Sequence, residues 1–229
     1  MDDLAVLASA GAFVGTHLLL SHPLRRPLIK ALGEGGFLIA YSLVAAVTLG
    51  ITAWVYGKVP ARAALWPVGD VLWGAVTIVM LVASIMLVGS LVKNPALPGA
   101  AASAATARAQ GVYAITRHPM MWAFALWGVC HIAVYPVTKN IIVAVAIIVL
   151  ALVGAALQDR KKAGLDPAGW PAWEARTSYW PFAAMVQGRA HLGKFGVHAL
   201  GGGVVVWLGA TWAHIPLAGW TAGIWRWVM

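Results

Sequence analysis

Residues 71–92 read VLWGAVTIVMLVASIMLVGSLV, a run of 22 residues without a charged side chain. About 20 consecutive apolar residues are enough for a helix to cross the hydrocarbon core of a bilayer. A run this apolar must be helical in lipid, because the bilayer offers no partner for free backbone groups. The alternation of apolar and polar residues that is typical of a membrane barrel is absent. The stretch therefore predicts a transmembrane helix.

Five further apolar runs are long enough, or nearly so, to cross a bilayer in the same way. They are Leu4–Leu20, Phe37–Gly57, Pro119–Val134, Ile141–Leu157 and Phe195–Ala213. There is no internal repeat and no separate soluble domain. We therefore expect an all-α fold, a polytopic membrane helical bundle of about six transmembrane helices, which forms one domain over residues 1–229. The glycine run at residues 201–203 is expected to permit close helix packing rather than to bind phosphate.

The composition agrees with a membrane protein. Of the 229 residues, 61% are hydrophobic and 10% are charged, whereas an ordinary soluble domain has about 25% charged residues. So few charges cannot solvate a compact soluble surface, which argues against a soluble enzyme. The net charge of +9 would suggest nucleic acid in a soluble protein. Here the basic residues lie between apolar runs, so we expect the bilayer to be the partner and expect no nucleic acid.

The distribution of basic residues predicts the orientation. The five loops between the six runs hold three, two, three, one and six Lys or Arg residues in chain order. Cytoplasmic loops carry the excess of such residues, so the odd loops are expected in the cytoplasm and both termini outside. This arrangement predicts a multi-pass protein of a bacterial inner (cytoplasmic) membrane.

Two loops have compositions of their own. The third loop, residues 94–116, is rich in Ala, Pro and Gly and is expected to be flexible or peripheral. The fifth loop interleaves Trp170, Trp173 and Trp180 with basic residues. Aromatic and basic side chains together favour the headgroup level of a bilayer. We expect an interfacial or re-entrant segment there, with a cap over a cytoplasmic site as the alternative.

Histidines are the residues most able to carry chemistry in this chain, because an ionisable group inside a span is costly and needs a reason to be there. The seven are His17, His22, His118, His131, His191, His198 and His214. His17 lies near the cytoplasmic end of the first span, and His131 lies well inside the fourth. We expect His191, His198 and His214 to be hydrogen-bonding or interfacial residues, not ligands.

His118 and His131 share one short segment. Pro119 suits the first turn of a helix, so Arg117 and His118 are expected where the fourth span enters the membrane. Thirteen residues separate the two histidines, or roughly 20 Å along a helix. They cannot both be axial ligands of one haem, but each can pair with a histidine of another span, and His17 is the obvious second ligand. Alternatively, Arg117 simply anchors the chain to lipid phosphate.

Three segments together resemble the NnrU family of membrane proteins. The strongest is Arg117-His118-Pro119 followed by Leu126-Trp127 and His131. The N-terminal pattern is His17, Arg25, Leu32-Gly33-Glu34 and Phe37. The fifth loop adds Trp173-Glu174-Ala175-Arg176-Thr177-Ser178 and Pro181-Phe182. The resemblance extends over essentially the whole chain.

The resemblance implies a function and a cofactor. Bacterial NnrU proteins are associated with denitrification, in the expression or assembly of nitrite and nitric oxide reduction, so the resemblance implies a redox, sensing or assembly role. Plant and cyanobacterial relatives are 15-cis-zeta-carotene isomerases that carry haem b. Matched by motif, their two iron ligands correspond to His17 and His131. The expected cofactor site also includes His118 and Arg117, and the expected small ligand is a diatomic gas or an apolar polyene.

The predicted topology conflicts with one part of this assignment. His17 is expected near the cytoplasmic face and His131 nearer the outer face, so their depths differ by about two helical turns, or 10 Å. His118 matches the depth of His17 better and is the alternative ligand.

Two other functions remain open. One is a haem-dependent isomerase of a carotenoid-like polyene. The other is a membrane methyltransferase that uses S-adenosylmethionine, because Arg117-His118-Pro119 also opens a motif of the isoprenylcysteine carboxyl methyltransferase group. That group usually has a Tyr where this chain has Met121, and only Glu174 is available as the later acidic partner.

Overall fold

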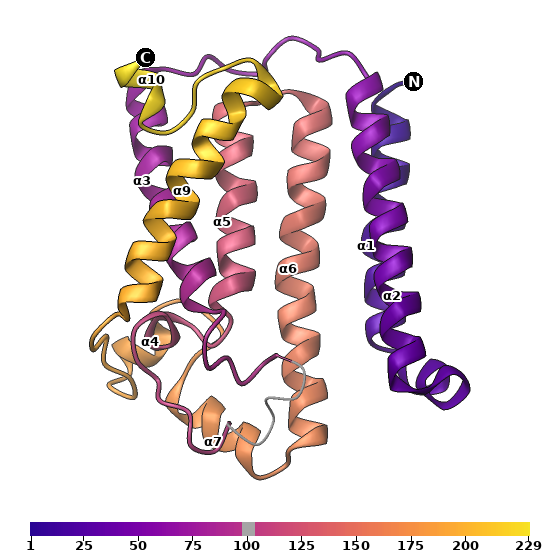
Figure 1. Cartoon of the computed structure of the whole chain (residues 1–229), viewed down its shortest axis with the longest axis vertical. Helices are drawn as coiled ribbons and strands as arrows, with labels where there is room; N and C mark the ends of the chain where they lie inside the picture. The colour runs from indigo at the N-terminus through magenta and orange to yellow at the C-terminus, as the bar shows by residue number, and fades with distance from the viewer. Residues whose placement is uncertain (98–103) are drawn as a thin grey trace.

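Six long helices dominate the structure, a computed structural model that describes residues 1–97 and 104–229. They are α1 (Asp3–Ser21), α2 (Arg25–Lys58), α3 (Asp70–Gly89), α5 (Pro119–Val134), α6 (Thr138–Leu165) and α9 (Val197–Ala218), and they stand side by side in Figure 1. Four short helices connect or follow them: α4 (Val112–Ile115), α7 (Gly169–Arg176), α8 (Ala183–Val186) and α10 (Trp225–Val228). The described residues contain no β-strand, so the prediction of an all-α fold is confirmed.

The long helices correspond to the six predicted spans. Five are long and apolar enough to cross a membrane, and α5 is a shorter apolar helix of 16 residues. Apolar side chains such as Leu43, Val71 and Val205 are exposed on them, as expected of surfaces that face lipid. Both chain termini lie at the same end of the bundle in Figure 1, as an even number of spans requires. The chain is therefore a polytopic membrane protein.

The two helices that extend furthest beyond the apolar runs are α2 and α6. α2 begins at Arg25 instead of Phe37, with Gly33 at φ 72° interrupting its helical geometry, a conformation that glycine tolerates without a steric penalty. α6 continues past Leu157 to Leu165 and carries Asp159 on the additional turns. Hydropathy marks where a helix enters lipid, whereas helical hydrogen bonds form equally well outside the lipid. The apolar runs therefore underestimate the lengths of both helices.

The helices pack in a spatial order that differs from their order in the chain. α3 contacts both α5 and α9, α5 contacts α6, and α6 contacts α1, which pairs with α2. Small residues permit the close approaches. A Cβ atom at Gly203 would lie 2.7 Å from Ile85 Cα, and one at Gly128 would lie 2.6 Å from Ile148 Cγ1. The predicted packing role of the glycine run is thus confirmed at Gly203.

A buried cluster at the end of the bundle opposite the termini corrects the expectations for two tryptophans of the fifth loop and for the end of the third loop. Trp170 and Trp173 are fully buried and pack with Tyr113 and Ile115 of the third loop. They do not face a membrane interface, because protein from α3, α4 and α5 covers them. The third loop is not peripheral at residues 112–116, which are buried. Its residues 98–103 lie outside the described part of the chain.

Candidate functional site

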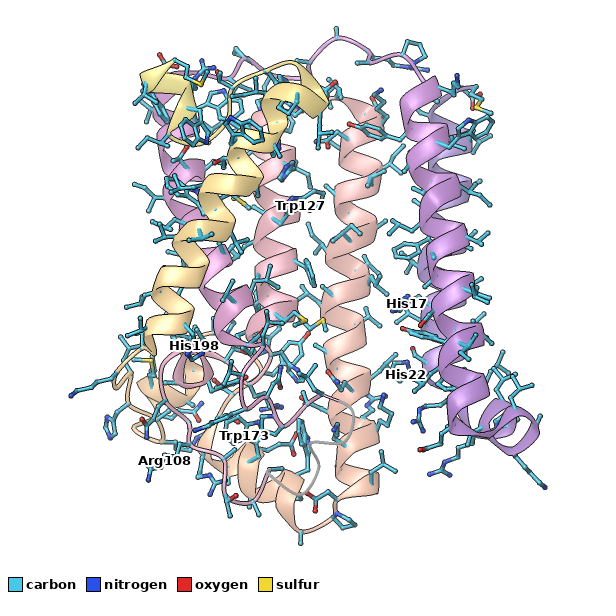
Figure 2. The ribbon with its side chains drawn as sticks, viewed as in Figure 1. His17, His22, Arg108, Trp127, Trp173 and His198 are labelled. Carbon is cyan, nitrogen blue, oxygen red and sulfur yellow. The ribbon has the colours of Figure 1, made fainter. Side chains whose placement is uncertain are left out.

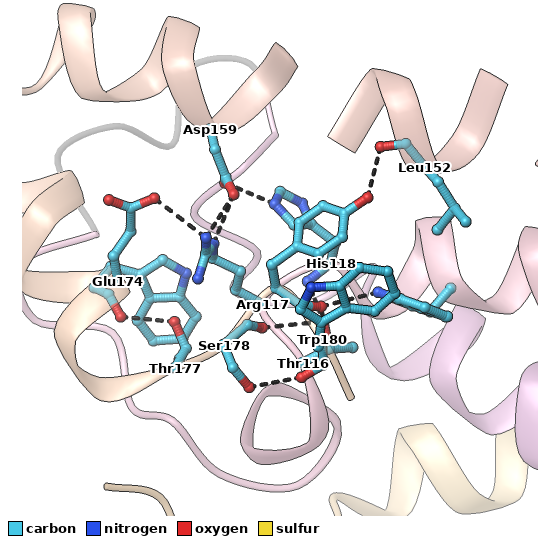
Figure 3. A network of polar contacts seen from close by, with 12 residues as sticks. Thr116, Arg117, His118, Leu152, Asp159, Glu174, Thr177, Ser178 and Trp180 are labelled. Carbon is cyan, nitrogen blue, oxygen red and sulfur yellow. Dashed lines mark hydrogen bonds and ion pairs between the residues drawn. The ribbon is translucent and has the colours of Figure 1, made fainter. Parts of the chain in front are cut away.

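An ion-pair network joins the start of α5 to the far end of α6 (Figure 3). Arg117 Nε and Nη2 donate to Asp159 Oδ2 at 2.9 and 2.7 Å. His118 Nε2 lies 2.7 Å from Asp159 Oδ1. All three side chains are nearly buried, His118 almost completely. Asp159 thus holds two consecutive residues of the Arg-His-Pro motif with its two oxygens.

A second carboxylate and an aromatic ring complete this network. Glu174 Oε1 of α7 lies 3.3 Å from Arg117 Nη2. The Tyr179 ring packs edge-on against His118, and its hydroxyl donates to Leu152 O at 2.7 Å. Burial, with the Asp159 carboxylate adding to it, raises the pKa of the Tyr179 phenol. The phenol therefore remains a hydrogen-bond donor at neutral pH.

The network is suited to holding helices together. His118 Nε2 is engaged by Asp159, so it can reach an iron atom only if that bond breaks. The two carboxylates neutralise the Arg117 guanidinium, which is therefore engaged within the protein. Sequence reasoning did not single out Asp159. The available signal was a lone acidic residue two positions after the apolar run that ends at Leu157.

His17 lies on α1, where the lower half of Figure 2 shows it between the α1–α2 pair and α6. Its Nε2 is hydrogen-bonded to the Tyr41 hydroxyl of α2, and its Nδ1 is buried without a partner among the described residues. It lines a cavity of about 350 Å³ that also touches Met121 and Phe124 of α5. His17 therefore faces a partly apolar space. No histidine of α5 lines this cavity.

His131 is placed next to His214. The centroids of the two imidazole rings are 6.1 Å apart, and the ring planes are inclined by 31°. His131 Nδ1 is 2.8 Å from Trp127 O, and His214 Nδ1 is 2.8 Å from Ala210 O. Each ring is thus anchored to the carbonyl four residues earlier in its own helix. Both lie near the ends of α5 and α9, at the same end of the bundle as the termini.

The structure does not bring His17 and His131 together. α6 lies between α1 and α5 in Figure 1. The cavity at His17 reaches α5 at Phe124, which precedes His131 by seven residues, or about 10 Å of helix. Figure 2 shows the same difference in depth, with Trp127 labelled above His17. Whether His17, His118 and Arg117 contact a cofactor stays a prediction.

The described residues contain no group of three or more His, Cys, Asp or Glu side chains arranged to hold a metal ion. The neighbouring imidazoles of His131 and His214 belong to two different helices, α5 and α9.

The chain matches a known protein family over most of its length. The family model described as "NnrU protein" matches residues 5–222. The chain belongs to the NnrU family. No curated protein and no solved structure matches it. The NnrU match includes the Arg-His-Pro network, the His17 cavity and the His131–His214 pair, so all three belong to the family's own region of the chain.

Proposed function

We propose that this NnrU-family protein binds haem b between His131 and His214. We further propose that it acts as a redox or gas-responsive component of nitrogen-oxide respiration in a bacterial inner membrane. The respiratory role rests on the resemblance to denitrification-associated proteins, and the ligand pair rests on the geometry. His214 replaces His17 as the partner that the resemblance implied.

The hydrogen bonds to Nδ1 carry this proposal. A carbonyl oxygen can only accept, so the Nδ1 atoms of His131 and His214 must both donate. A neutral imidazole that carries its proton on Nδ1 has its lone pair on Nε2. Neither Nε2 has a hydrogen-bond partner among the described residues. Histidine ligands of metals are commonly oriented in this way, with the second ring nitrogen donating to a backbone carbonyl.

The placement of the two rings supports the same proposal. The imidazoles come from different helices, and their centroids lie 6.1 Å apart. α5 and α9 both pack on α3, and α9 makes no extensive contact with α5. The two imidazoles would therefore hold one iron atom from two different helices.

The residues around the pair serve to hold it. The Trp127 ring lies against His131 with a centroid distance of 4.1 Å, which fixes the imidazole on one side. Asn140 donates to the backbone carbonyl of His131 and to that of Tyr135, which secures the end of α5. Haem held by His131 and His214 would supply one-electron transfer and the binding of a diatomic gas.

The test is spectroscopic. The purified full-length protein is titrated with haemin, and absorbance and electron paramagnetic resonance spectra are recorded. We expect a low-spin bis-histidine signal in the wild type. His131→Ala and His214→Ala should each convert it to high-spin or abolish binding, while the exposed His191→Ala should leave it unchanged.

Three results contradict the assignment. If the wild type binds no haem, the proposed function is wrong. If the low-spin haem signal is lost in His17→Ala and the His214→Ala spectrum is unchanged, His17 is the second ligand. If the low-spin haem signal is lost in His118→Ala and the His131→Ala spectrum is unchanged, the haem site lies at the opposite end of the bundle. Size-exclusion profiles that match the wild type show in each case that the variant is folded.

A further inference from the structure

A second cavity, independent of the histidine pair, lies where α3 ends and α9 begins. Its volume is about 650 Å³, within the range of small-molecule sites. Lys93, Arg108, Lys194 and His198 line it. Figure 2 shows Arg108 and His198 at the end of the bundle opposite the termini. Two lysines and an arginine thus converge on one cavity from the loop that follows α3 and the segment that precedes α9.

Three other basic residues at this end of the molecule have structural partners. Lys162 donates to the carbonyls of Pro95 and Leu97, Arg176 to those of Ala104 and Ala105, and Arg189 to those of Ala175 and Thr177. Within the described part of the chain, the side chains of Lys93, Arg108 and Lys194 make no such hydrogen bond and no ion pair. Lys93 also adopts φ 53°, which is uncommon for a residue other than glycine. The cavity cations are therefore available to a ligand.

None of the seven carboxylates of the chain lines this cavity. Asp159 and Glu174 are paired with Arg117, and Asp166 accepts from the backbone nitrogen of Gly169 at the start of α7. Asp3 and Asp70 form ion pairs with Arg62 and Arg226. Asp2 caps the start of α1, and Glu34 lines a different cavity. The positive charge of the cavity is thus not balanced by acidic residues of the protein.

The rest of the lining is largely apolar, with Thr106, Gln110 and Tyr113 as its uncharged polar members. Val92, Val112, Phe195 and Ala199 contribute to it. The cavity adjoins the ends of two membrane-spanning helices, which is the depth of lipid headgroups. Basic pockets between membrane helices bind anionic headgroups in this way. We propose that this cavity binds a phosphate group, either of an anionic lipid or of a free phosphate compound. In this site, the negatively charged phosphate is contacted by the side chains of Lys93, Arg108 and Lys194.

The test compares two probes and two charge variants. The full-length protein in a neutral detergent is titrated with short-chain phosphatidic acid and, separately, with inorganic phosphate, and binding is measured by calorimetry. The site variant carries Lys93→Gln, Arg108→Gln and Lys194→Gln. The control variant carries Arg26→Gln, Lys30→Gln and Arg160→Gln, three exposed residues outside the cavity with the same total change in charge.

We expect the site variant to bind phosphatidic acid at least about tenfold more weakly than the wild type, and the control variant to bind it within a factor of about two. Binding of both probes, lost together in the site variant, supports a site for a free phosphate group. Binding of the lipid alone supports a headgroup site that also uses the apolar lining. An equal loss in both variants would reduce the effect to general surface charge and overturn the proposal, as would no binding of either probe to the wild type.

Discussion

Replacing Asp159 with Asn tests whether the Arg-His-Pro network holds the bundle together. The substitution keeps the shape of the side chain and removes its charge. Asp159 uses both oxygens, Oδ2 for Arg117 and Oδ1 for His118. An amide has one acceptor oxygen, so at least one of these two buried partners loses its acceptor. The remaining –NH₂ group then faces a guanidinium or an imidazole nitrogen.

The size of the effect follows from burial. The Arg117 and Asp159 side chains are 13% and 12% exposed. Removing one partner of a buried ion pair costs roughly 3–5 kcal/mol. Glu174 still lies 3.3 Å from Arg117, so we expect the lower end, a loss of about 3 kcal/mol in the free energy of unfolding. A loss of this size changes the equilibrium constant about 100-fold.

Equilibrium unfolding in mixed detergent micelles, followed by far-ultraviolet circular dichroism, measures this loss. Glu174→Gln is the matched control, because Glu174 is 35% exposed and its pairing should contribute at most about 1 kcal/mol. Arg117→Met should also cost less in the Asp159→Asn background than alone, since the two residues interact. Equal losses in Asp159→Asn and Glu174→Gln would refute the view that Asp159 is the centre of the network.

Three further results are expected. Reporter fusions after Val92 and after Leu165 should both behave as cytoplasmic, and periplasmic activity at both sites would mean that the orientation is inverted. Gly203→Leu should destabilise the protein by about 1–3 kcal/mol in the same unfolding assay, because its Cβ would meet Ile85 Cα. Gly209→Leu on the same helix, with nothing within 4 Å, should have little effect. Carbon monoxide added to the reduced, haem-loaded protein should shift the Soret band, whereas an unchanged band would exclude gas binding. Conversion of cis-zeta-carotene in cells that express the protein would instead favour the isomerase function.

The membrane bundle could be predicted from local sequence alone. A run such as residues 71–92 has no stable state in lipid other than a helix, because each backbone group must find its partner within the segment. The helix limits were less predictable. α6 continues for eight residues beyond Leu157 because a helix does not have to end where the lipid does. The burial of Trp170 and Trp173 was also missed, since aromatic residues suit a lipid interface and a protein core equally well.

The sequence by itself determined which residues are able to carry chemistry. An intramembrane histidine such as His131 and the Arg117-His118 pair stand out because ionisable groups are costly near lipid. Their partners were decided only by the tertiary structure. Asp159 and His214 are 42 and 83 residues away from Arg117 and His131, and nothing local connects them. The packing of α5 against α6, and of α3 against both α5 and α9, sets the rotation and depth at which those side chains meet. The spacing of residues within one helix carries no information about its rotation and depth relative to another helix.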